Sequence, residues 1–582
     1  MDVVRAAQRH ASSIAVRAAG RAIRYRDLLG SSEQLAAQIV HQLPPRPPGA
    51  EHGPRIGIYA EPGFGYVAST WAAWMAGGVA VPLAVSHPPA EIDYVIKDAG
   101  VSLVLAPESS VSKLEATVHA AGSSLHVLDP SLFSSAVPDA DAGPSAGSPG
   151  PDEQRHASHA GAGGSGREEG SGALIIYTSG TTGRPKGALH THGSLSAQVG
   201  CLVDAWRWAA SDRILHALPL HHIHGIVNAL HCAHAAGACV DFMTSFQPNA
   251  AWRRLRDDDI TVLMAVPTMY TFLLMAYDKA PPDQKPALRE AASKLRLAVS
   301  GSAAAPVALL ERWREVSGQT LLERYGMTET GMILSNPYEG ERRAGFVGLP
   351  LPGVRVQVAQ DADAPSGVDP DPSSGEPLTG DLRVGGPFLF KEYWGRPEAT
   401  ADAFDANGFF KTGDVVGLEG RPPYFRVRGT AAPADSQPSH QLTARCAVRA
   451  AAARCHLRGA RLDAGLFRVA ASPALRRIKP ILGRASVDII KSNAFKVSAL
   501  EVEGAVLESD AVQGEAITAL VVLKEGATLG PDPAAVLRAF CTERLPKYKV
   551  PSAWRLLQQP LPRNAMGKIN KKDLVRRLGD LE

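Results

Sequence analysis

The stretch YTSGTTGRPKGALHTH, residues 177–192, places glycines, hydroxyl side chains and a lysine within one short segment. Glycine lets backbone N–H groups turn inward on a concave loop, and Ser and Thr hydroxyls add donors. The composition therefore suits an anion with several oxygens, above all a polyphosphate. Gly180 and Gly183 are the candidates for the turn. The P-loop has a different spacing, so a Walker-type site is excluded, while a flexible Gly/Ser/Thr linker is the alternative interpretation.

A second candidate for chemistry is the run LPLHHIHGIVNALHCAHAAGAC, residues 218–239, which is rich in histidine and cysteine. Structural zinc sites need paired ligands at fixed spacing, such as Cys-x-x-Cys. The run has no such pair, and the residues after His224 read as the start of a helix. We therefore expect no zinc site in this run.

Buried elements must position the first motif. Residues 173–177 (ALIIY) read as a short buried strand that would carry the loop to a sheet edge, where α/β proteins bind ligands. Residues 66–85 carry no charge and are long enough to suggest a membrane span. Gly77, Gly78 and Pro82 instead predict a buried helix that ends at the glycines, followed by a short strand.

Composition limits the possible functions. The chain has 582 residues, of which 45% are hydrophobic, enough to bury large cores. Its 61 basic and 58 acidic residues nearly cancel, so no nucleic-acid or membrane-surface footprint is indicated. Six cysteines in so long a chain do not make a disulfide framework, which favours a reducing compartment. We expect the cytoplasm or the mitochondrial matrix, and no protein partner is evident.

Two segments depart from a globular pattern. Residues 134–172 consist of Gly, Ser, Ala, Pro and charged residues with almost no large apolar side chain, which predicts a disordered loop. Residues 430–480 are rich in Ala and Arg without a sustained period. We interpret them as an atypical insertion that takes no part in catalysis.

Three further motifs follow the first in order along the chain: LLERYGMTET at 321–330, FKTGDVV at 410–416 and LPRNAMGKIN at 561–570. With this ordered set, the chain resembles the acyl-adenylate-forming superfamily, and within it most closely the malonyl-CoA synthetases. The resemblance implies an α/β fold with a large N-terminal adenylate-forming domain, residues 1–429, and a small C-terminal α+β lid domain, residues 481–582. The lid would rotate on a hinge near Arg484.

The resemblance also implies an ATP site. Thr328 would contact phosphate, Glu329 would hold Mg²⁺, and Lys568 would reach the reacting carboxylate. The other nucleotide-binding residues would be Thr178, Ser179, Gly180, Thr181, Thr182, Gly183 and Lys186 on the phosphate loop, Gly301, Ser302, Ala303, Tyr325 and Gly326 at the adenine, Asp414 at the ribose, and Arg484.

The implied acyl pocket contains His222, Arg324 and Met327, and the implied coenzyme A face of the lid contains Lys491 and Lys496. If one malonate carboxylate attacks ATP, the other enters the pocket charged and needs a partner, because an isolated buried carboxylate is very unfavourable. A guanidinium gives a planar two-point match. Two alternatives are that Arg324 pairs with an acid such as Glu323 at the surface, and that Arg296 is the pocket cation.

The expected function is the ATP-dependent ligation of malonate or methylmalonate to coenzyme A through an acyl-adenylate, with release of AMP and pyrophosphate. The substrates would be small molecules, without nucleic acid and without a membrane span. Two alternatives stay open: a ligase for another short or aryl carboxylic acid, and a nucleotide-binding pseudoenzyme with a damaged lid. The lid departs from the family pattern, since Asn493 and Ala494 replace a glycine pair.

Overall fold

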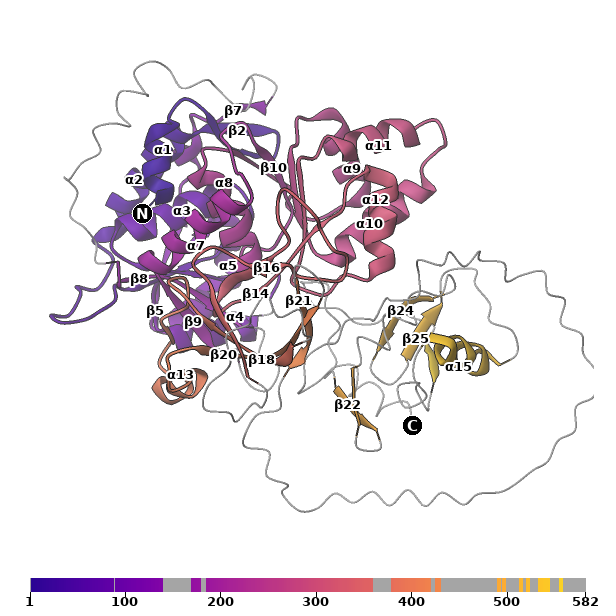
Figure 1. The fold of residues 1–582 in the computed structure, drawn as a ribbon. Helices are drawn as coiled ribbons and strands as arrows, with labels where there is room; N and C mark the ends of the chain where they lie inside the picture. Colours follow the sequence, from indigo (N-terminus) through magenta and orange to yellow (C-terminus); the bar gives the residue numbers. More distant parts are fainter. Residues whose placement is uncertain are drawn as a thin grey trace, which may run out of the picture.

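The chain folds around two large sheets with helices between and beside them (Figure 1). The computed structural model describes residues 2–87, 89–139, 169–178, 185–359, 378–419, 424–430, 489–492, 495–498, 512–516, 520–523, 532–544 and 554–557.

The larger sheet has the strand order β16-β15-β14-β13-β12-β10-β11-β1-β2-β7. Its central strands β1, β11, β10, β12, β13 and β14 are parallel neighbours. Strands β10, β11, β12 and β13 are short and fully buried, as expected for strands covered on both faces. The strands are β1 Ile14–Ala18, β2 Arg21–Arg24, β7 Val137–Pro138, β10 Arg213–His216, β11 Cys239–Phe242, β12 Val262–Ala265, β13 Leu297–Ser300, β14 Leu322–Met327, β15 Gly331–Ser335 and β16 Leu349–Pro350.

The second sheet has the order β19-β9-β8-β4-β3-β5-β6. At its edge, β9 pairs antiparallel with both β8 and β19, so a strand from far along the chain lies beside the phosphate-loop hairpin. The strands are β3 Arg55–Ile58, β4 Val79–Pro82, β5 Val101–Pro107, β6 Ser124–Leu128, β8 Gly172–Tyr177, β9 Gly187–Thr191 and β19 Glu392–Tyr393. The predicted strand at 173–177 is confirmed as β8.

A smaller antiparallel sheet has the order β17-β18-β20-β21, with β17 Arg355–Ala359, β18 Leu378–Gly385, β20 Phe410–Glu419 and β21 Tyr424–Thr430. It carries the third motif on β20. Further along the chain, the described elements are β22 Ile489–Ser492, β23 Phe495–Ser498, β24 Val512–Ala516, β25 Leu520–Leu523, α15 Pro533–Arg544 and β26 Arg555–Leu557.

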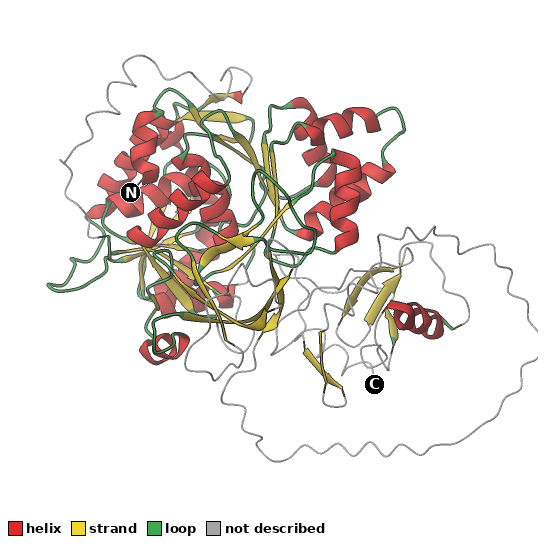
Figure 2. Ribbon diagram, viewed as in Figure 1, coloured by secondary structure: helices red, strands yellow, loops and turns green. Residues whose placement is uncertain are grey.

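One core cluster joins residues of both large sheets with residues of α2, α3, α7 and α8, so these helices lie between the sheets (Figure 2). Helices α9–α12 lie together on the other side of the larger sheet. The helices are α1 Asp2–Arg9, α2 Tyr25–Val40, α3 Phe64–Met75, α4 Pro89–Ala99, α5 Val111–Ala120, α7 His192–Ala205, α8 Cys232–Ala235, α9 Pro248–Asp257, α10 Pro267–Lys279, α11 Lys285–Ser293, α12 Val307–Ser317 and α13 Pro397–Ala403, with 3-10 turns η1 Glu108–Ser110 and η2 Pro130–Phe133 and a π-helix, η4, at His224–His231.

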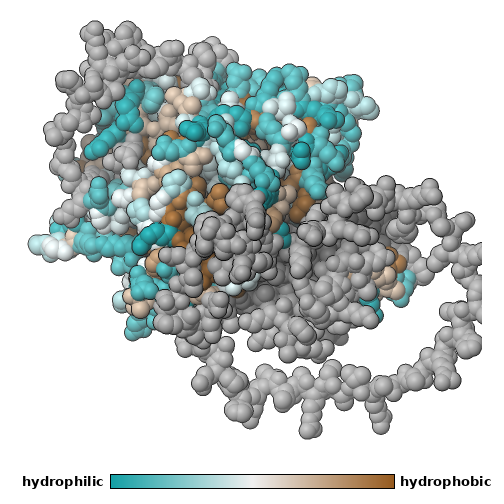
Figure 3. All heavy atoms as spheres, in the orientation of Figure 1, coloured by the Kyte–Doolittle hydropathy of each residue, from teal (hydrophilic) through white to brown (hydrophobic). Residues whose placement is uncertain are grey.

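Helix α3 confirms the prediction for the uncharged run. It ends at Met75, before Gly77 and Gly78, and β4 follows at Val79. Residues 66–74 are all buried, including Trp71 and Trp74, so the helix is apolar all round because it lies inside the protein. Among the described residues, no helix is both long and apolar enough to cross a bilayer. Figure 3 shows mainly hydrophilic side chains on the visible face at α9–α12.

Described strands reach into both atypical segments. Val137 and Pro138 form β7, which pairs with β2, and Gly172 begins β8, so the predicted disordered loop at 134–172 is wrong at both ends. Backbone pairing to β2 and β9 orders residues whose side chains contribute little apolar area. Strand β21 likewise ends at Thr430, the first residue of the predicted insertion. Residues 140–168 and 431–480 lie outside the described residues.

Candidate active site

The carboxyl end of β13 lies beside the first residues of β14, because these strands are parallel neighbours with Ser300 opposite Glu323. The chain leaves β13 through Gly301 and Ser302, and Ser302 adopts the left-handed region at φ 67°. Arg324 lies on β14 beside this turn, and its side chain passes over Gly301. A Cβ added at Gly301 would lie 2.4 Å from the guanidinium carbon of Arg324, so the close approach requires glycine.

Arg324 is a buried cation for which the described residues provide no ion pair. The residue is 4% exposed, and among the described residues its Nε and Nη2 have no hydrogen-bond partner. Burial lowers the pKa of the guanidinium to about 9, which still leaves it protonated at neutral pH. A buried charge without a partner is very unfavourable, so the arrangement fits an anionic ligand.

Both alternatives for Arg324 are wrong. Glu323 is buried rather than at the surface, and its Oε2 accepts a hydrogen bond of 2.8 Å from the backbone N–H of Gly345. Burial raises the pKa of Glu323 to about 8. Arg296 forms a two-point ion pair with Asp212, and it precedes β13, at the opposite end of the strand from Gly301.

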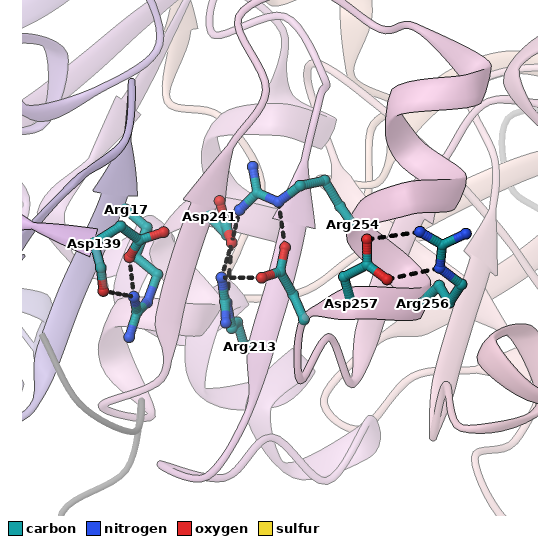
Figure 4. Close-up of polar contacts among 8 residues, drawn as sticks. Arg17, Asp139, Arg213, Asp241, Arg254, Arg256 and Asp257 are labelled. Atoms are coloured by element: carbon teal, nitrogen blue, oxygen red, sulfur yellow. Dashed lines mark hydrogen bonds and ion pairs between the residues drawn. The ribbon is translucent and has the colours of Figure 1, made fainter. Parts of the chain in front are cut away.

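Several arginines on or beside the larger sheet are paired with carboxylates, as Arg296 is. Figure 4 shows Arg213 and Arg254 sharing Asp241, and Arg17 paired with Asp139. These cations are paired within the protein, whereas Nε and Nη2 of Arg324 have no hydrogen-bond partner among the described residues.

His224, the neighbour of the predicted His222, lies against the Gly301 turn. It begins the π-helix, and its Nδ1 is 3.0 Å from Ser302 Oγ, while its buried Nε2 has no hydrogen-bond partner among the described residues. Burial and then the positive charge of Arg324 hold the pKa of His224 well below its ordinary value, so the ring is neutral. His222 is half-buried, with its ring 4.1 Å from that of His221.

The remaining histidines and cysteines of this run lie on the π-helix, α8 and β11. The helix predicted after His224 is confirmed. In the part of the chain that the structure describes, no group of three or more His, Cys, Asp or Glu residues has an arrangement that could hold a metal ion.

The base of the phosphate loop is closed by β8 and β9. The N–H of Thr178 donates to the Lys186 carbonyl at 2.9 Å, and the hydroxyls of Tyr177 and Tyr94 donate to Asp98 and to the Pro185 carbonyl. These contacts fix both ends of the loop. The predicted residues between them, Ser179, Gly180, Thr181, Thr182 and Gly183, lie outside the described residues.

Thr328 and Glu329 lie in the turn between β14 and β15. Glu329 is 7% exposed, and its Oε1 accepts a hydrogen bond of 2.8 Å from the hydroxyl of Tyr393. Burial and the charge of Glu329 raise the pKa of Tyr393, so the phenol is protonated and donates. His190 Nε2 lies 2.7 Å from the Thr328 carbonyl, and burial lowers the pKa of His190 to about 4, so the neutral ring donates this bond.

The ribose and adenine candidates also come together. Asp414 on β20 is 4% exposed and accepts a hydrogen bond from the hydroxyl of Tyr325. The Asp414 N–H donates to Thr412 Oγ1 at 3.1 Å, across a left-handed Gly413. Met327 is half-buried, and its sulfur lies 3.9 Å from the Tyr325 hydroxyl, while Gly326 lies between these two residues. Ala303 is exposed just beyond the Gly301 turn.

The lid residues are only partly described. Lys491 on β22 lies opposite Lys496 on β23 in an antiparallel hairpin. Arg484 and Lys568 lie outside the described residues. Their roles stay predictions.

Family models match both parts of the chain. The model described as AMP-binding enzyme matches residues 3–394, and the model described as AMP-binding enzyme C-terminal domain matches residues 502–568. The chain belongs to the AMP-binding enzyme family. The predicted fold class of a large N-terminal AMP-binding domain followed by a C-terminal domain is thereby confirmed, and the second match ends at Lys568.

Two curated relatives align over nearly the whole of this AMP-binding enzyme. The malonate–CoA ligase of Arabidopsis thaliana is 34% identical, covering 100% of this chain and 90% of that protein. The mitochondrial malonate–CoA ligase of Homo sapiens is 37% identical, covering 95% of this chain and 88% of that protein. Among solved structures, ATP-bound MatB from Rhodopseudomonas palustris has a TM-score of 0.73 at 28% identity, covering 99% of each chain.

A second solved structure includes bound products. A malonyl-CoA ligase in a ternary complex with methylmalonyl-CoA and AMP has a TM-score of 0.60 at 29% identity, covering 95% of this chain and 97% of that one.

Sequence reasoning missed three residues of the AMP-binding enzyme's site: His190, His224 and Tyr393. Tyr393 and His190 contact the Thr328–Glu329 turn from strands that pair with each other, across long separations in sequence. No local motif signals such contacts. For His224, the signal was the same histidine run that suggested His222, but the residue that faces Ser302 depends on where the π-helix begins.

Proposed function

We propose that this enzyme ligates malonate to coenzyme A with ATP, releasing AMP and pyrophosphate, and that it also accepts methylmalonate. The observation that carries the proposal is the buried guanidinium of Arg324 over Gly301, whose Nε and Nη2 have no hydrogen-bond partner among the described residues. A monocarboxylic acid would leave this cation buried and unpaired, whereas the second carboxylate of malonate would neutralise it. The names of the relatives that align over the chain agree with this substrate.

Arg324 and His224 would bind the unreactive carboxylate. Arg324 offers Nε and Nη2 to one carboxylate in a two-point contact. The neutral ring of His224 can donate one more hydrogen bond without adding charge. Because Arg324 and His224 lie at the Gly301 turn, the other carboxylate would be held toward the Thr328 turn, where the phosphates are expected.

The reacting carboxylate would attack the α-phosphate of ATP in line, and pyrophosphate would leave. Asp414 would accept hydrogen bonds from the ribose hydroxyls, and Tyr325 would stack on adenine. Lys568 would approach with the lid and stabilise the charge that develops on the reacting oxygens. The thiol of coenzyme A would then displace AMP from the acyl-adenylate.

Glu329 fits the role proposed for it as the magnesium ligand. It is a buried carboxylate that takes part in none of the ion pairs among the described residues, and within that part of the chain its carboxylate accepts a hydrogen bond only from the neutral phenol of Tyr393. Carboxylate and phosphate oxygens are the ligands that Mg²⁺ prefers. When bound, the ion would neutralise phosphate charge during the displacement.

The experiment measures two half-reactions separately on the purified chain. Pyrophosphate release is followed with malonate, methylmalonate, acetate and benzoate, and AMP and acyl-CoA are then followed after addition of coenzyme A. We expect both products with malonate. A faster first step with acetate or benzoate would assign another acid, pyrophosphate without acyl-CoA would indicate a damaged lid, and ATP binding without either product would indicate a pseudoenzyme.

The compartment is also a proposal, for which we favour the mitochondrial matrix over the cytoplasm. Its support is the animal relatives, whose names include the word mitochondrial. Cell fractionation of the tagged full-length protein would test it.

A further inference from the structure

Tyr393 contacts both Glu329 and Lys186, two oppositely charged residues of the proposed ATP site. Its hydroxyl donates to Glu329 Oε1 at 2.8 Å, and its ring lies under Lys186, whose Nζ is 4.7 Å from the ring centre. Glu329 and Lys186 are not within ion-pair distance of each other among the described residues. The ring and hydroxyl of one side chain therefore satisfy both charged groups separately.

The side chain of Tyr393 is held firmly. It is 9% exposed and packs with Phe390 and Phe410, with its ring centre 4.7 Å from that of Phe390. Its backbone pairs with Ala188 of β9, the strand that follows the phosphate loop, and its N–H donates to Thr400 Oγ1 at 3.0 Å. A donor whose rotamer is fixed by packing can fix the orientation of the group it contacts.

A neutral phenol affects the charge of Glu329 differently from a cationic partner. A lysine or arginine bound to Glu329 would cancel the charge that attracts a metal ion, whereas a phenol occupies one carboxylate oxygen and leaves the charge in place. The other oxygen can then bind a cation. A cation over an aromatic face is held more weakly than one in a buried ion pair, so Lys186 can move to incoming phosphates.

We propose that Tyr393 is a positioning residue for MgATP: its hydroxyl orients Glu329 toward the metal ion, and its ring keeps Lys186 from pairing with that carboxylate. This inference rests on the proposed use of ATP and Mg²⁺, and it is independent of the acid substrate. The pairing of β19 with β9 is what brings the Tyr393 ring under Lys186, the lysine at the end of the phosphate loop.

The central variant is Tyr393→Phe, which removes the hydroxyl and keeps the ring. Binding of ATP is measured calorimetrically without any acid, once with Mg²⁺ and once with EDTA, and the ratio of the two dissociation constants gives the coupling between metal and nucleotide. We expect this coupling to fall about three- to tenfold, because a hydrogen bond to a charged group is lost. The Mg²⁺ concentration for half-maximal pyrophosphate release should rise by a similar factor, with the KM for malonate unchanged.

Tyr393→Leu also removes the ring. Lys186 then becomes able to pair with Glu329, and we expect a further loss of ATP affinity that higher Mg²⁺ does not restore. Tyr25→Phe is the matched control, because Tyr25 is buried and donates its hydroxyl to the Ala238 carbonyl outside the site. That variant should lose stability and keep the parent's metal coupling.

A double-mutant cycle with Glu329→Gln separates orientation from general packing. If Tyr393 acts through Glu329, then Tyr393→Phe should have little added effect on metal coupling in the Glu329→Gln background. Equal effects in both backgrounds, or an unchanged coupling in Tyr393→Phe, would overturn the proposal. Failure of the parent to release pyrophosphate with malonate would refute the proposed acid substrate and leave the binding comparison intact.

Discussion

The guanidinium of Arg324 lies directly over Gly301, where a Cβ at position 301 would come within 2.4 Å of its central carbon. The pair joins the end of one strand to the body of its parallel neighbour, and it leaves a buried cation facing the turn that His224 also contacts. The position of the cation proposed to bind the substrate carboxylate therefore depends on residue 301 having no side chain.

Arg324→Ala should change the choice of acid. Truncating one partner of a desolvated charge pair costs about 2–5 kcal/mol. The kcat/KM for malonate should therefore fall at least about thirtyfold, since 1.4 kcal/mol corresponds to a factor of ten. Activity on acetate should fall much less, or rise. The measurement is the malonate-to-acetate ratio of kcat/KM, with exposed Arg314→Ala as control; an unchanged ratio would remove Arg324 from the site.

Gly301→Ala should have a related effect through crowding. The new methyl group would overlap the end of a flexible side chain, so Arg324 must move. We expect the kcat/KM for malonate to fall by roughly tenfold or more, equivalent to about 1.4 kcal/mol, and the malonate-to-acetate ratio to fall with it. Gly200→Ala on α7 is the control, because a Cβ there has open space. Wild-type preference for malonate in Gly301→Ala would show that Arg324 acts from another position.

Lys568→Ala should slow adenylation far more than it weakens ATP binding. Charge develops on the reacting oxygens in the transition state, and a lysine placed there contributes mainly to kcat. Pyrophosphate release at saturating ATP and malonate is compared with the dissociation constant of ATP. Near-normal pyrophosphate release would end the proposed role of this residue.

Stability should fall below neutral pH because of four buried histidines. Burial lowers the pKa of His190 and His216 to about 4, and that of His231 and His234 to about 3, against an ordinary value of 6.5. The unfolded chain then binds more protons than the folded one as pH falls below 6.5. Each histidine should cost about 1 kcal/mol by pH 5.5.

The measurement for this prediction is urea unfolding followed between pH 7.5 and 5.5. His231→Gln should show a shallower pH dependence than the parent, whatever its stability at pH 7.5. An equal slope would mean that His231 is protonated in the folded protein.

The sequence predicted the elements that local pattern controls. The strand before the phosphate loop, helix α3 and the helix after His224 each depend on a short run of apolar residues and on glycines at its end. The order of the motifs predicted that Tyr325 and Asp414 serve one site, and the structure brings them into contact. Residues 134–139 were misjudged because edge pairing with β2 needs few apolar side chains.

The rest depends on contacts that no local pattern encodes. From the sequence, Tyr393 has no visible link to the phosphate loop, because the link depends on the pairing of β19 with β9. His190 looks like an ordinary polar residue within a buried strand. Adjacent residues of a strand face opposite sides, so Glu323 points away from its neighbour Arg324 and does not pair with it. Such facts follow from tertiary packing.

The pairing of β19 with β9 also affects how the protein is made. Tyr393 lies 216 residues after Tyr177, so the strand beside the phosphate loop is translated long after the loop itself. At 5–20 residues per second, the nascent chain carries an open-edged hairpin for on the order of 10–40 s. The exposed edge of β9 is then available to other strands. Slow translation between these points should therefore increase the need for chaperones, even though every residue of the loop has already been synthesised.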